Sequence, residues 1–421
     1  MLRALFSLLL LACLESHAQS VKNFSTAASP QEAGFSPQRL SRIDNLLEEQ
    51  VRNQSIPGAV ALIVRNGKIV YYKAFGYSDV EKKTPLKKDD IFRIASQSKA
   101  ITSLAVMMLW EEGKFLLDDP VSKYIPEFKN PKILKSFNAK DSSYTTEPAK
   151  GEITIRHLLT HSSGIGYAVI GSPEFNAIYA RAGVPSGIGN HTQVLGEKMK
   201  ILATLPLRHE PGTAWTYGLN CDVLGYLVEI WSGMSFDRFL ATRVFAPLGM
   251  KDTYFYLPKE KQGRLVALHG NKDGKVFKMK SPPYDAASPD YPNLDGRYFS
   301  GGAGMSSTVE DYAKFLQLFL NGGAFNGTRL LSRKTVDLML MDQLPQLPTE
   351  FGLGFGLETP ANDYNSPKTA GTFAWGGAFS TTYWADPKEH LLGLLYTNIY
   401  NNPNGGLDEK FEVLTYQAIA D

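Results

Sequence analysis

The chain has 421 residues, of which 43% are hydrophobic and 20% are charged. This composition is typical of a globular protein with a large core, and it argues against a disordered or fibrous chain. The 44 basic and 42 acidic side chains leave a net charge of only +2. There is therefore no electrostatic case for nucleic acid or an anionic membrane surface as a partner. The length allows one large domain or two to three smaller ones.

The first 18 residues, MLRALFSLLLLACLESHA, have the features of a secretory signal peptide. Arg3 gives a positive start, residues 4–12 form a short apolar run, and small residues precede a cleavage site near Ala18-Gln19. The apolar run is too short to span a bilayer as a helix, and no later segment resembles a membrane span. We therefore expect an exported protein, periplasmic or secreted. The alternative is a lipoprotein anchored through Cys13.

Hydrophobic periodicity predicts the elements at the start of the mature chain. Residues 37–53 carry apolar side chains at helical spacing. Two β-rich runs, at residues 59–65 and 68–76, flank an Asn-Gly pair and predict a hairpin. A short β-like run at residues 91–94 leads into a long helical pattern from residue 96 to 113.

The rest of the chain is expected to contain a helical region followed by strands. The strand patterns and the last helix lie at residues 373–375, 382–385, 391–398 and about 407–420, with turns at Gly376-Gly377 and Asp386-Pro387. Strands at both ends of the chain predict one sheet built from N- and C-terminal segments, hence an α+β fold with a cleft between two parts. The expected domain spans residues 33–421. Its α/β part comprises about 33–110 and 266–421, and its inserted, mainly helical part comprises about 111–265.

Several common catalytic constellations are absent from the sequence. There is no G-x-S-x-G, no P-loop and no H-E-x-x-H motif. His157 and His161 are four residues apart and could share a helical face as metal ligands. No carboxylate motif accompanies them, so capping or packing of a helix is the favoured interpretation.

One Ser-x-x-Lys motif, Ser96 to Lys99, stands at the start of the predicted long helix. Residues three apart share a helix face, so Lys99 can reach the Ser96 hydroxyl. A serine in the first turn also lies at the positive end of the helix dipole, which favours a developing alkoxide. Taken singly, the motif is equally compatible with an N-capping serine and a surface lysine.

Two further segments accompany this motif. Tyr217 stands in the stretch Pro211–Asn220 ahead of an amphipathic helix, and residues 372–378 form a late strand that ends in a double glycine. With these segments, the sequence resembles the serine β-lactamase and penicillin-binding-protein superfamily, in its class C β-lactamase-like branch and closest to the family VIII carboxylesterases. Other signature stretches follow in matching order: Ile153–His161 with Ser162-Ser163-Gly164, Ala246–Met250 with Asp252-Thr253, Gly301–Thr308, Phe351–Leu357 and Trp384–Pro387.

The resemblance covers nearly all of residues 33–415, and it implies both a fold and a mechanism. The implied fold is β-lactamase/transpeptidase-like, with an antiparallel sheet flanked by helices. In the implied mechanism Ser96 is the nucleophile and Lys99 and Tyr217 share its proton; which of the two is the formal base stays open. The backbone N–H groups of Ser96 and Ala378 would form the oxyanion hole. The resemblance implies no metal, no organic cofactor and no obligatory protein partner.

The sequence departs from the family pattern at two substrate-binding motifs. Where relatives read Tyr-x-Asn, the third position here is Leu219. Where relatives read Lys-Thr-Gly or His-Thr-Gly, this chain has Trp375, Gly376 and Gly377. In the family the basic residue and the hydroxyl help bind a substrate carboxylate. A charge-assisted contact of that kind contributes about 1.5–3 kcal/mol, so we expect weaker binding of anionic substrates.

These departures favour a small-molecule ester or amide substrate, and in particular short-chain neutral esters, with side activity on β-lactams. The alternatives are a class C-like β-lactamase or a D-Ala-D-Ala carboxypeptidase or D-aminopeptidase; a catalytically silent peptidoglycan-binding protein is more remote. Removal of the leader would leave Cys221 as the only thiol, which excludes an intramolecular disulfide. We expect Cys221 to be a small core residue near the site. Loop-like segments at residues 140–150, 183–191 and 281–296 are candidates for the rim of the cleft.

Overall fold

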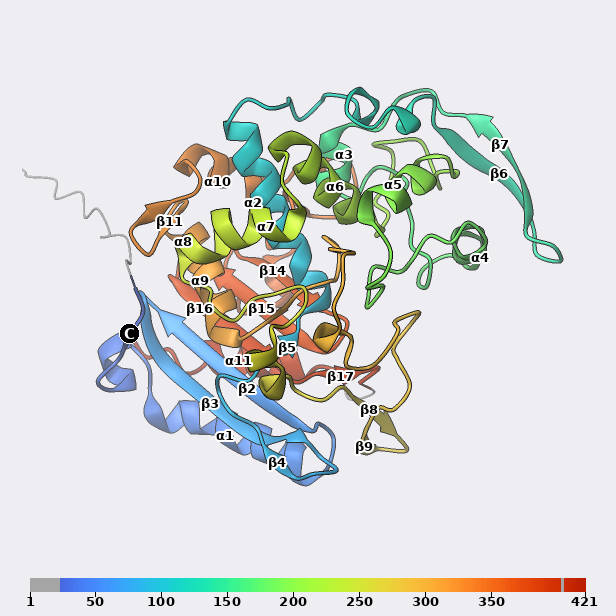
Figure 1. The fold of residues 1–421 in the computed structure, drawn as a ribbon. Helices are drawn as coiled ribbons and strands as arrows, with labels where there is room; N and C mark the ends of the chain where they lie inside the picture. Colours follow the sequence, from blue (N-terminus) through green and yellow to red (C-terminus); the bar gives the residue numbers. More distant parts are fainter. Residues whose placement is uncertain (1–22, 403–404) are drawn as a thin grey trace, which may run out of the picture.

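The computed structural model describes residues 23–402 and 405–421 (Figure 1). The predicted signal peptide and Cys13 lie outside the described residues. Within this part of the chain, no helix is both long enough and apolar enough to cross a membrane.

An eight-stranded sheet forms the centre of the structure, and segments from both ends of the chain build it. The strands, in spatial order, are β1 (Ser25–Thr26), β3 (Lys68–Asp79), β2 (Gly58–Arg65), β16 (Leu391–Tyr396), β15 (Thr381–Asp386), β14 (Phe373–Gly377) and β13 (Gly356–Leu357), with β4 (Thr84–Pro85) beside β3. The two ends of the chain meet where β2 pairs antiparallel with β16. The predicted hairpin and the single sheet are both confirmed.

Helices cover the two faces of this sheet (Figure 1). Every residue of β2 is buried, and alternate side chains enter different cores. Ala59, Ala61 and Ile63 pack with helices α1 (Pro37–Arg52) and α11 (Leu407–Tyr416). The intervening Val60, Leu62 and Val64 pack with helices α2 (Ser98–Glu111) and α9 (Val309–Leu320). Because a strand alternates its side chains between two faces, this burial fixes the register of β2.

A mainly helical part lies beyond α2. Its helices include α3 (Ile155–Leu159), α4 (Pro173–Arg181), α5 (Leu195–Ala203), α6 (Asn220–Ser232) and α7 (Phe236–Leu240). Helix α6, predicted from its apolar spacing, packs directly against α2. Ser96 and Tyr217 precede these two helices, so the packing of α2 against α6 brings the two motifs together.

The structure corrects three details of the predicted secondary structure. The expected loop at residues 140–150 belongs largely to a projecting hairpin of β6 (Lys132–Asn138) and β7 (Ser143–Pro148) (Figure 1). The side chains of this hairpin are mostly exposed on both faces, so it has no alternation of buried apolar residues to reveal it. Gly376 and Gly377 belong to β14, and the turn comes after them. Ser96 lies in a 3-10 turn, η2 (Ala95–Gln97), and α2 begins two residues later.

Candidate active site

Ser96 occupies a sharp turn between the strand β5 (Phe92–Arg93) and α2. The preceding residue, Ala95, has a φ of 42°, a left-handed conformation that is uncommon for a residue with a side chain. Such backbone strain is held only when the surrounding structure enforces it. Here both flanks of the turn are anchored, since the Ile94 amide donates to Met305 O and the Ser98 Oγ accepts from the Met305 amide. The turn therefore fixes Ser96 at the N-terminal end of α2.

Lys99 is buried beneath Ser96 and contacts it directly. Its Nζ lies 3.2 Å from Ser96 Oγ, 2.9 Å from Tyr167 OH and 2.8 Å from Gly302 O. The predicted reach of Lys99 to the serine hydroxyl is thus present. Among the described ion pairs, none involves Lys99. Its amino group is held by two hydroxyls and one carbonyl and has no carboxylate within ion-pair distance.

Two tyrosines surround the Lys99 amino group in different ways. Tyr217 presents the face of its ring, with Lys99 Nζ 4.4 Å from the ring centroid, whereas Tyr167 makes the hydrogen bond through its hydroxyl. Tyr217 lines the cleft, and Tyr167 is buried behind Lys99. Tyr167 was missed in the sequence. The one signal for it was its place directly after the signature stretch that ends at Gly164.

Burial governs the protonation of these groups. It raises the pKa of the Tyr167 phenol, and the Lys99 ammonium opposes this effect only in part. Burial by itself lowers the pKa of Lys99, but the negative charge of Tyr167 and Tyr217 in their ionised forms outweighs it, and the net shift is upward. The net upward shift favours the ammonium form of Lys99.

The end of β14 closes the site from the other side. A Cβ atom on Gly377 would overlap both Ile94 O and Thr381 Oγ1. Glycine is therefore needed for β14 to approach the Ser96 turn this closely. Ala378 follows directly and lines the same cleft as Ser96. Among the described residues, no backbone carbonyl accepts a hydrogen bond from the Ala378 amide, so this donor can serve a bound group.

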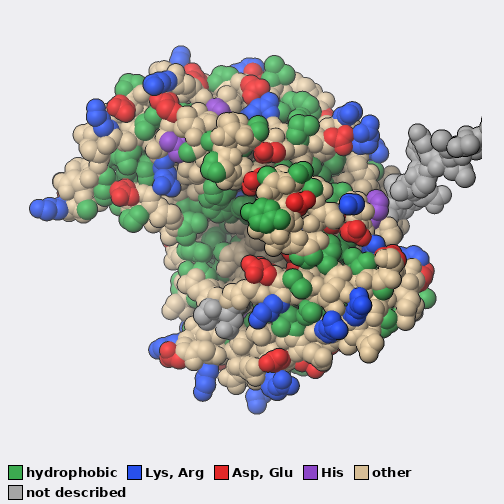
Figure 2. Space-filling model, turned by 180° about the vertical axis from the view of Figure 1, so that it is seen from behind, with side chains coloured by type: hydrophobic (Ala, Val, Ile, Leu, Met, Phe, Trp, Pro, Cys, Tyr) green, Lys and Arg blue, Asp and Glu red, His purple; other side chains and the backbone are tan. Residues whose placement is uncertain are grey.

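A cleft of about 1010 Å³ opens above Ser96. Hydrophobic side chains gather around a hollow on this face of the molecule (Figure 2). Four aromatic residues that line the cleft also contact one another: Trp215, Tyr217, Phe351 and Trp375. Trp375, Gly376 and Gly377, which were predicted to bind substrate, all line this cleft.

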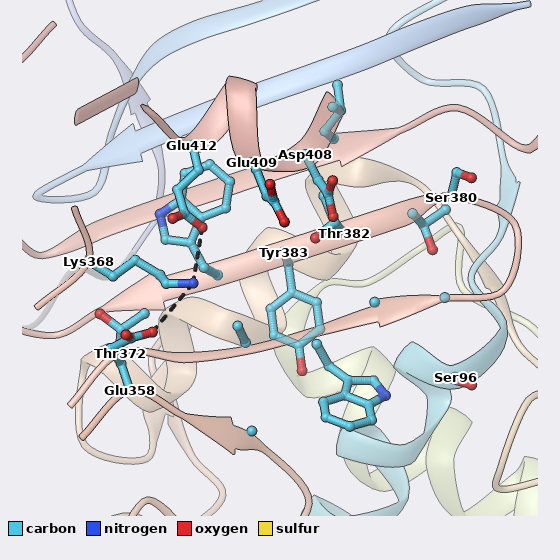
Figure 3. Close-up of a pocket in the computed structure, with 18 of the residues that line it drawn as sticks. Ser96, Glu358, Lys368, Thr372, Ser380, Thr382, Tyr383, Asp408, Glu409 and Glu412 are labelled. Atoms are coloured by element: carbon cyan, nitrogen blue, oxygen red, sulfur yellow. Dashed lines mark ion pairs between the residues drawn. The ribbon is translucent and has the colours of Figure 1, made fainter. Parts of the chain in front are cut away.

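The other end of the cleft is polar. Figure 3 shows Ser96 at one side of the view and Lys368 at the other, between Glu358 and Glu412. Lys368 Nζ lies 3.5 Å from Glu358 Oε2 and 3.1 Å from Glu412 Oε2. Of the described residues that line the cleft, Lys368 is the one basic side chain. Both glutamates already engage it.

The structure contradicts the prediction that Leu219 binds substrate. Leu219 is fully buried, caps the start of α6 and is absent from the cleft lining. Its amide donates to Gly166 O, which turns the side chain into the core. Asn220 is also absent from the cleft lining, because its side-chain amide bonds His161 Nδ1 and Ser163 Oγ. The position of Leu219 in the motif did not reveal that its side chain enters the core.

The histidines and the cysteine have structural roles. His157 completes a capping box with Thr154 at the start of α3, and His161 is buried against the Tyr217 ring. The described residues contain no group of three or more His, Cys, Asp or Glu side chains that could hold a metal ion. Cys221 is buried in the core, and burial raises the pKa of its thiol to about 12, which makes it a poor nucleophile.

Comparison with known proteins identifies the family of the chain. The family model described as Beta-lactamase matches residues 43–417. Esterase EstB from Burkholderia gladioli is 32% identical over 400 residues, covering 91% of this chain and 97% of the relative. A putative D-alanyl-D-alanine carboxypeptidase from Escherichia coli K12 is 28% identical, covering 94% of this chain and 90% of the relative.

Solved structures also resemble the chain. EstCE1, described as a hydrolase with promiscuous acyltransferase activity, superimposes with a TM-score of 0.77 at 27% identity, covering 90% of this chain and 99% of that structure. Simvastatin synthase (LovD) from Aspergillus terreus gives a TM-score of 0.75 at 26% identity, covering 90% and 98%. The fold is therefore the β-lactamase/transpeptidase fold.

Proposed function

The chain belongs to the beta-lactamase family and is a serine hydrolase, and from this premise we propose that it is a carboxylesterase acting on short-chain neutral esters. One observation carries the proposal: the cleft beside Ser96 has aromatic walls, and its described lining residues offer no unpaired basic side chain to a substrate carboxylate. Neutral, apolar acyl groups suit such walls, because they gain from burial and lose no charge solvation.

The first half of the reaction is acylation of Ser96. Its Oγ attacks the ester carbonyl carbon while its proton passes to the Lys99 and Tyr217 pair. The carbonyl oxygen gains negative charge, which the N–H groups of Ser96 and Ala378 stabilise. Of the two tyrosines, only Tyr217 borders the cleft, so its hydroxyl donates the proton to the departing alcohol.

The second half releases the acid. Water enters the place of the alcohol and gives its proton to the same pair, and its oxygen attacks the acyl carbon. The bond to Ser96 Oγ then breaks, and the serine recovers its proton. Tyr167 takes no part in proton transfer to the substrate in this scheme. It holds the Lys99 amino group beneath Ser96.

The test compares hydrolysis of p-nitrophenyl butyrate and nitrocefin on one preparation. We expect a higher kcat/KM for the ester, and a fluorophosphonate probe should label the wild type and not Ser96→Ala. A higher kcat/KM for nitrocefin would assign the chain to the β-lactamase or D,D-peptidase alternative. Labelling that survives Ser96→Ala would reject Ser96 as the nucleophile.

A further inference from the structure

One buried acidic group near the active site has no place in the mechanism above. Asp222 follows Cys221 in the first turn of α6 and is fully buried. Among the described residues no basic side chain forms an ion pair with its carboxylate, and the Ser300 hydroxyl and the Gly302 amide are its polar neighbours. Since burial of an unpaired carboxylate is costly, its retention here calls for a compensating positive charge.

The segment Gly301-Gly302 lies between Asp222 and Lys99. The carbonyl of Gly302 accepts a hydrogen bond from Lys99 Nζ at 2.8 Å. A Cβ atom on Gly302 would lie 2.6 Å from Asp222 Oδ2 and 3.4 Å from Tyr167 OH. A Cβ atom on Gly301 would overlap Cys221 O. Because both residues lack a side chain, only the backbone of Gly301-Gly302 separates the Asp222 carboxylate from Lys99 and Tyr167.

We propose that Asp222 is a positioning residue for catalysis, whose buried carboxylate is the counter-charge that holds Lys99 as an ammonium ion beneath Ser96. This inference rests on the proposed function of the Ser96 site. It accounts for two unusual features together, namely a buried lysine and a buried carboxylate that each lack an ion pair among the described residues. The Asp222 carboxylate supplies negative charge near the Lys99 ammonium ion, and the ammonium ion supplies positive charge near the carboxylate.

The charged and titratable groups around Asp222 come from several elements. Lys99 faces it from α2, Tyr167 from the segment after α3, Tyr298 from the segment before β10 (Ser306–Ser307), and Cys221 from its own helix. Lys99 is the only one of these groups that carries positive charge. Burial raises the pKa of Asp222 to about 6, against the lowering effects of Ser300, Lys99 and the Gly302 amide. Asp222 is therefore mainly ionised at neutral pH.

The sign of its effect does not depend on which group is the formal base. A nearby negative charge raises the pKa of both an ammonium ion and a phenol. If Asp222 loses its charge, the base is free of its proton at lower pH. The acid limb of the kcat/KM profile should then move to lower pH.

The test is the pH dependence of kcat/KM for p-nitrophenyl butyrate in the wild type and in Asp222→Asn. We expect the acid limb of the variant to lie about one pH unit lower, with the two profiles converging below the pKa of Asp222. Asp90→Asn is the matched control: Asp90 is also a buried carboxyl whose pKa burial raises, but it bonds the Lys87 amide and does not adjoin Lys99. It should leave the acid limb in place.

A second variant keeps the inference testable if Asp222→Asn folds poorly. Ser300→Ala removes a hydroxyl that favours the Asp222 carboxylate, so the acid limb should shift in the same direction by a smaller amount. An acid limb unmoved in either folded variant would overturn the proposal, even if the overall rate fell. A wild type without esterase or β-lactamase activity would instead refute the proposed function. That result differs from an unmoved acid limb in an active enzyme, which refutes only the role of Asp222.

Discussion

Two lysines lie near the cleft, one in its lining and one buried beneath Ser96, and the protein holds them in opposite ways. Lys368 sits 18% exposed between two glutamates, at 3.5 and 3.1 Å. Lys99 is 2% exposed and contacts hydroxyl groups and a carbonyl. An ion pair satisfies the first lysine fully. Lys99 donates a hydrogen bond to Ser96 Oγ. Its proposed counter-charge, the Asp222 carboxylate, lies on the other side of the Gly301-Gly302 backbone.

This difference suits Lys368 to a structural role and Lys99 to the proposed catalytic role. A lysine paired with carboxylates is stabilised in the ground state and has little to offer a transition state. A lysine held by hydroxyl oxygens and a carbonyl gains most when the serine oxygen becomes negative, because its field acts in a buried site of low polarity. The contrast predicts unequal responses to the same substitution.

The largest expected effect is that of Lys99→Met. Loss of the amino group removes both the partner for the Ser96 proton and the charge beside the alkoxide, so kcat/KM should fall by about 10⁴-fold. Lys368→Met is the matched control, and it should change kcat/KM by only a few-fold. Steady-state hydrolysis of p-nitrophenyl butyrate measures both. Equal losses in the two variants would show that the contrast between the lysines has no functional meaning.

The second comparison is between the two tyrosines at Lys99. Tyr217 borders the cleft and can reach a leaving group, so Tyr217→Phe should lower kcat by about 10²-fold. Tyr167→Phe removes one hydrogen bond to Lys99 and should lower kcat by only about tenfold, since the ammonium keeps two other contacts. Single-turnover acylation rates distinguish them. A larger loss in Tyr167→Phe would transfer the proton-donor role to that residue.

These tyrosines also show what the sequence could and could not reveal. Ser96, Lys99 and Tyr217 could be proposed as a set from the sequence, because the proposal depends on the Ser-x-x-Lys spacing and on the order of the motifs along the chain. Tyr167 could not be proposed, because its contact with Lys99 joins residues 68 positions apart, between α2 and the segment after α3. Asp222 was likewise invisible, since an acidic residue in the first turn of a helix is usually a solvated one.

The fold, like the site, was predictable only where the local sequence pattern determines the structure. The sheet was predictable where strands carry continuous buried apolar runs, as in β2 and β16. The β6–β7 hairpin was missed because its strands bury little on either face. Leu219 was misplaced because apolar character alone cannot tell a cleft wall from a core. Local pattern thus specified the elements, and the tertiary packing decided which side chains meet the substrate.

The next smaller effect concerns the two glycines of β14. Gly377→Ala should force the strand away from the Ser96 turn, because its Cβ would overlap Ile94 O. We expect kcat to fall by about tenfold to a hundredfold through displacement of the Ala378 amide, with a loss of about 1–3 kcal/mol in the free energy of unfolding. Denaturant unfolding and ester hydrolysis measure the two effects.

Gly376→Ala provides the control for that variant. A Cβ at Gly376 meets only Thr381 O, at 3.3 Å, so the strand can stay in place. Its kcat should change by no more than a few-fold. If both alanine variants lose activity equally, the close approach at Gly377 is not what aligns the oxyanion hole.

The smallest expected effect, and the one that tests substrate choice, is that of Trp375→Lys. This change places a cation where relatives carry one, so the kcat/KM ratio of nitrocefin to p-nitrophenyl butyrate should rise by about tenfold. Trp375 also packs against Phe351 and Tyr217, so loss of the ring alone could alter the ratio. Trp375→Met separates the two causes, because it removes the ring without adding charge. The carboxylate argument holds only if the lysine variant exceeds the methionine variant, with both retaining the wild-type melting temperature within a few degrees. Equal ratios in the two variants would assign the selectivity to the shape of the aromatic wall.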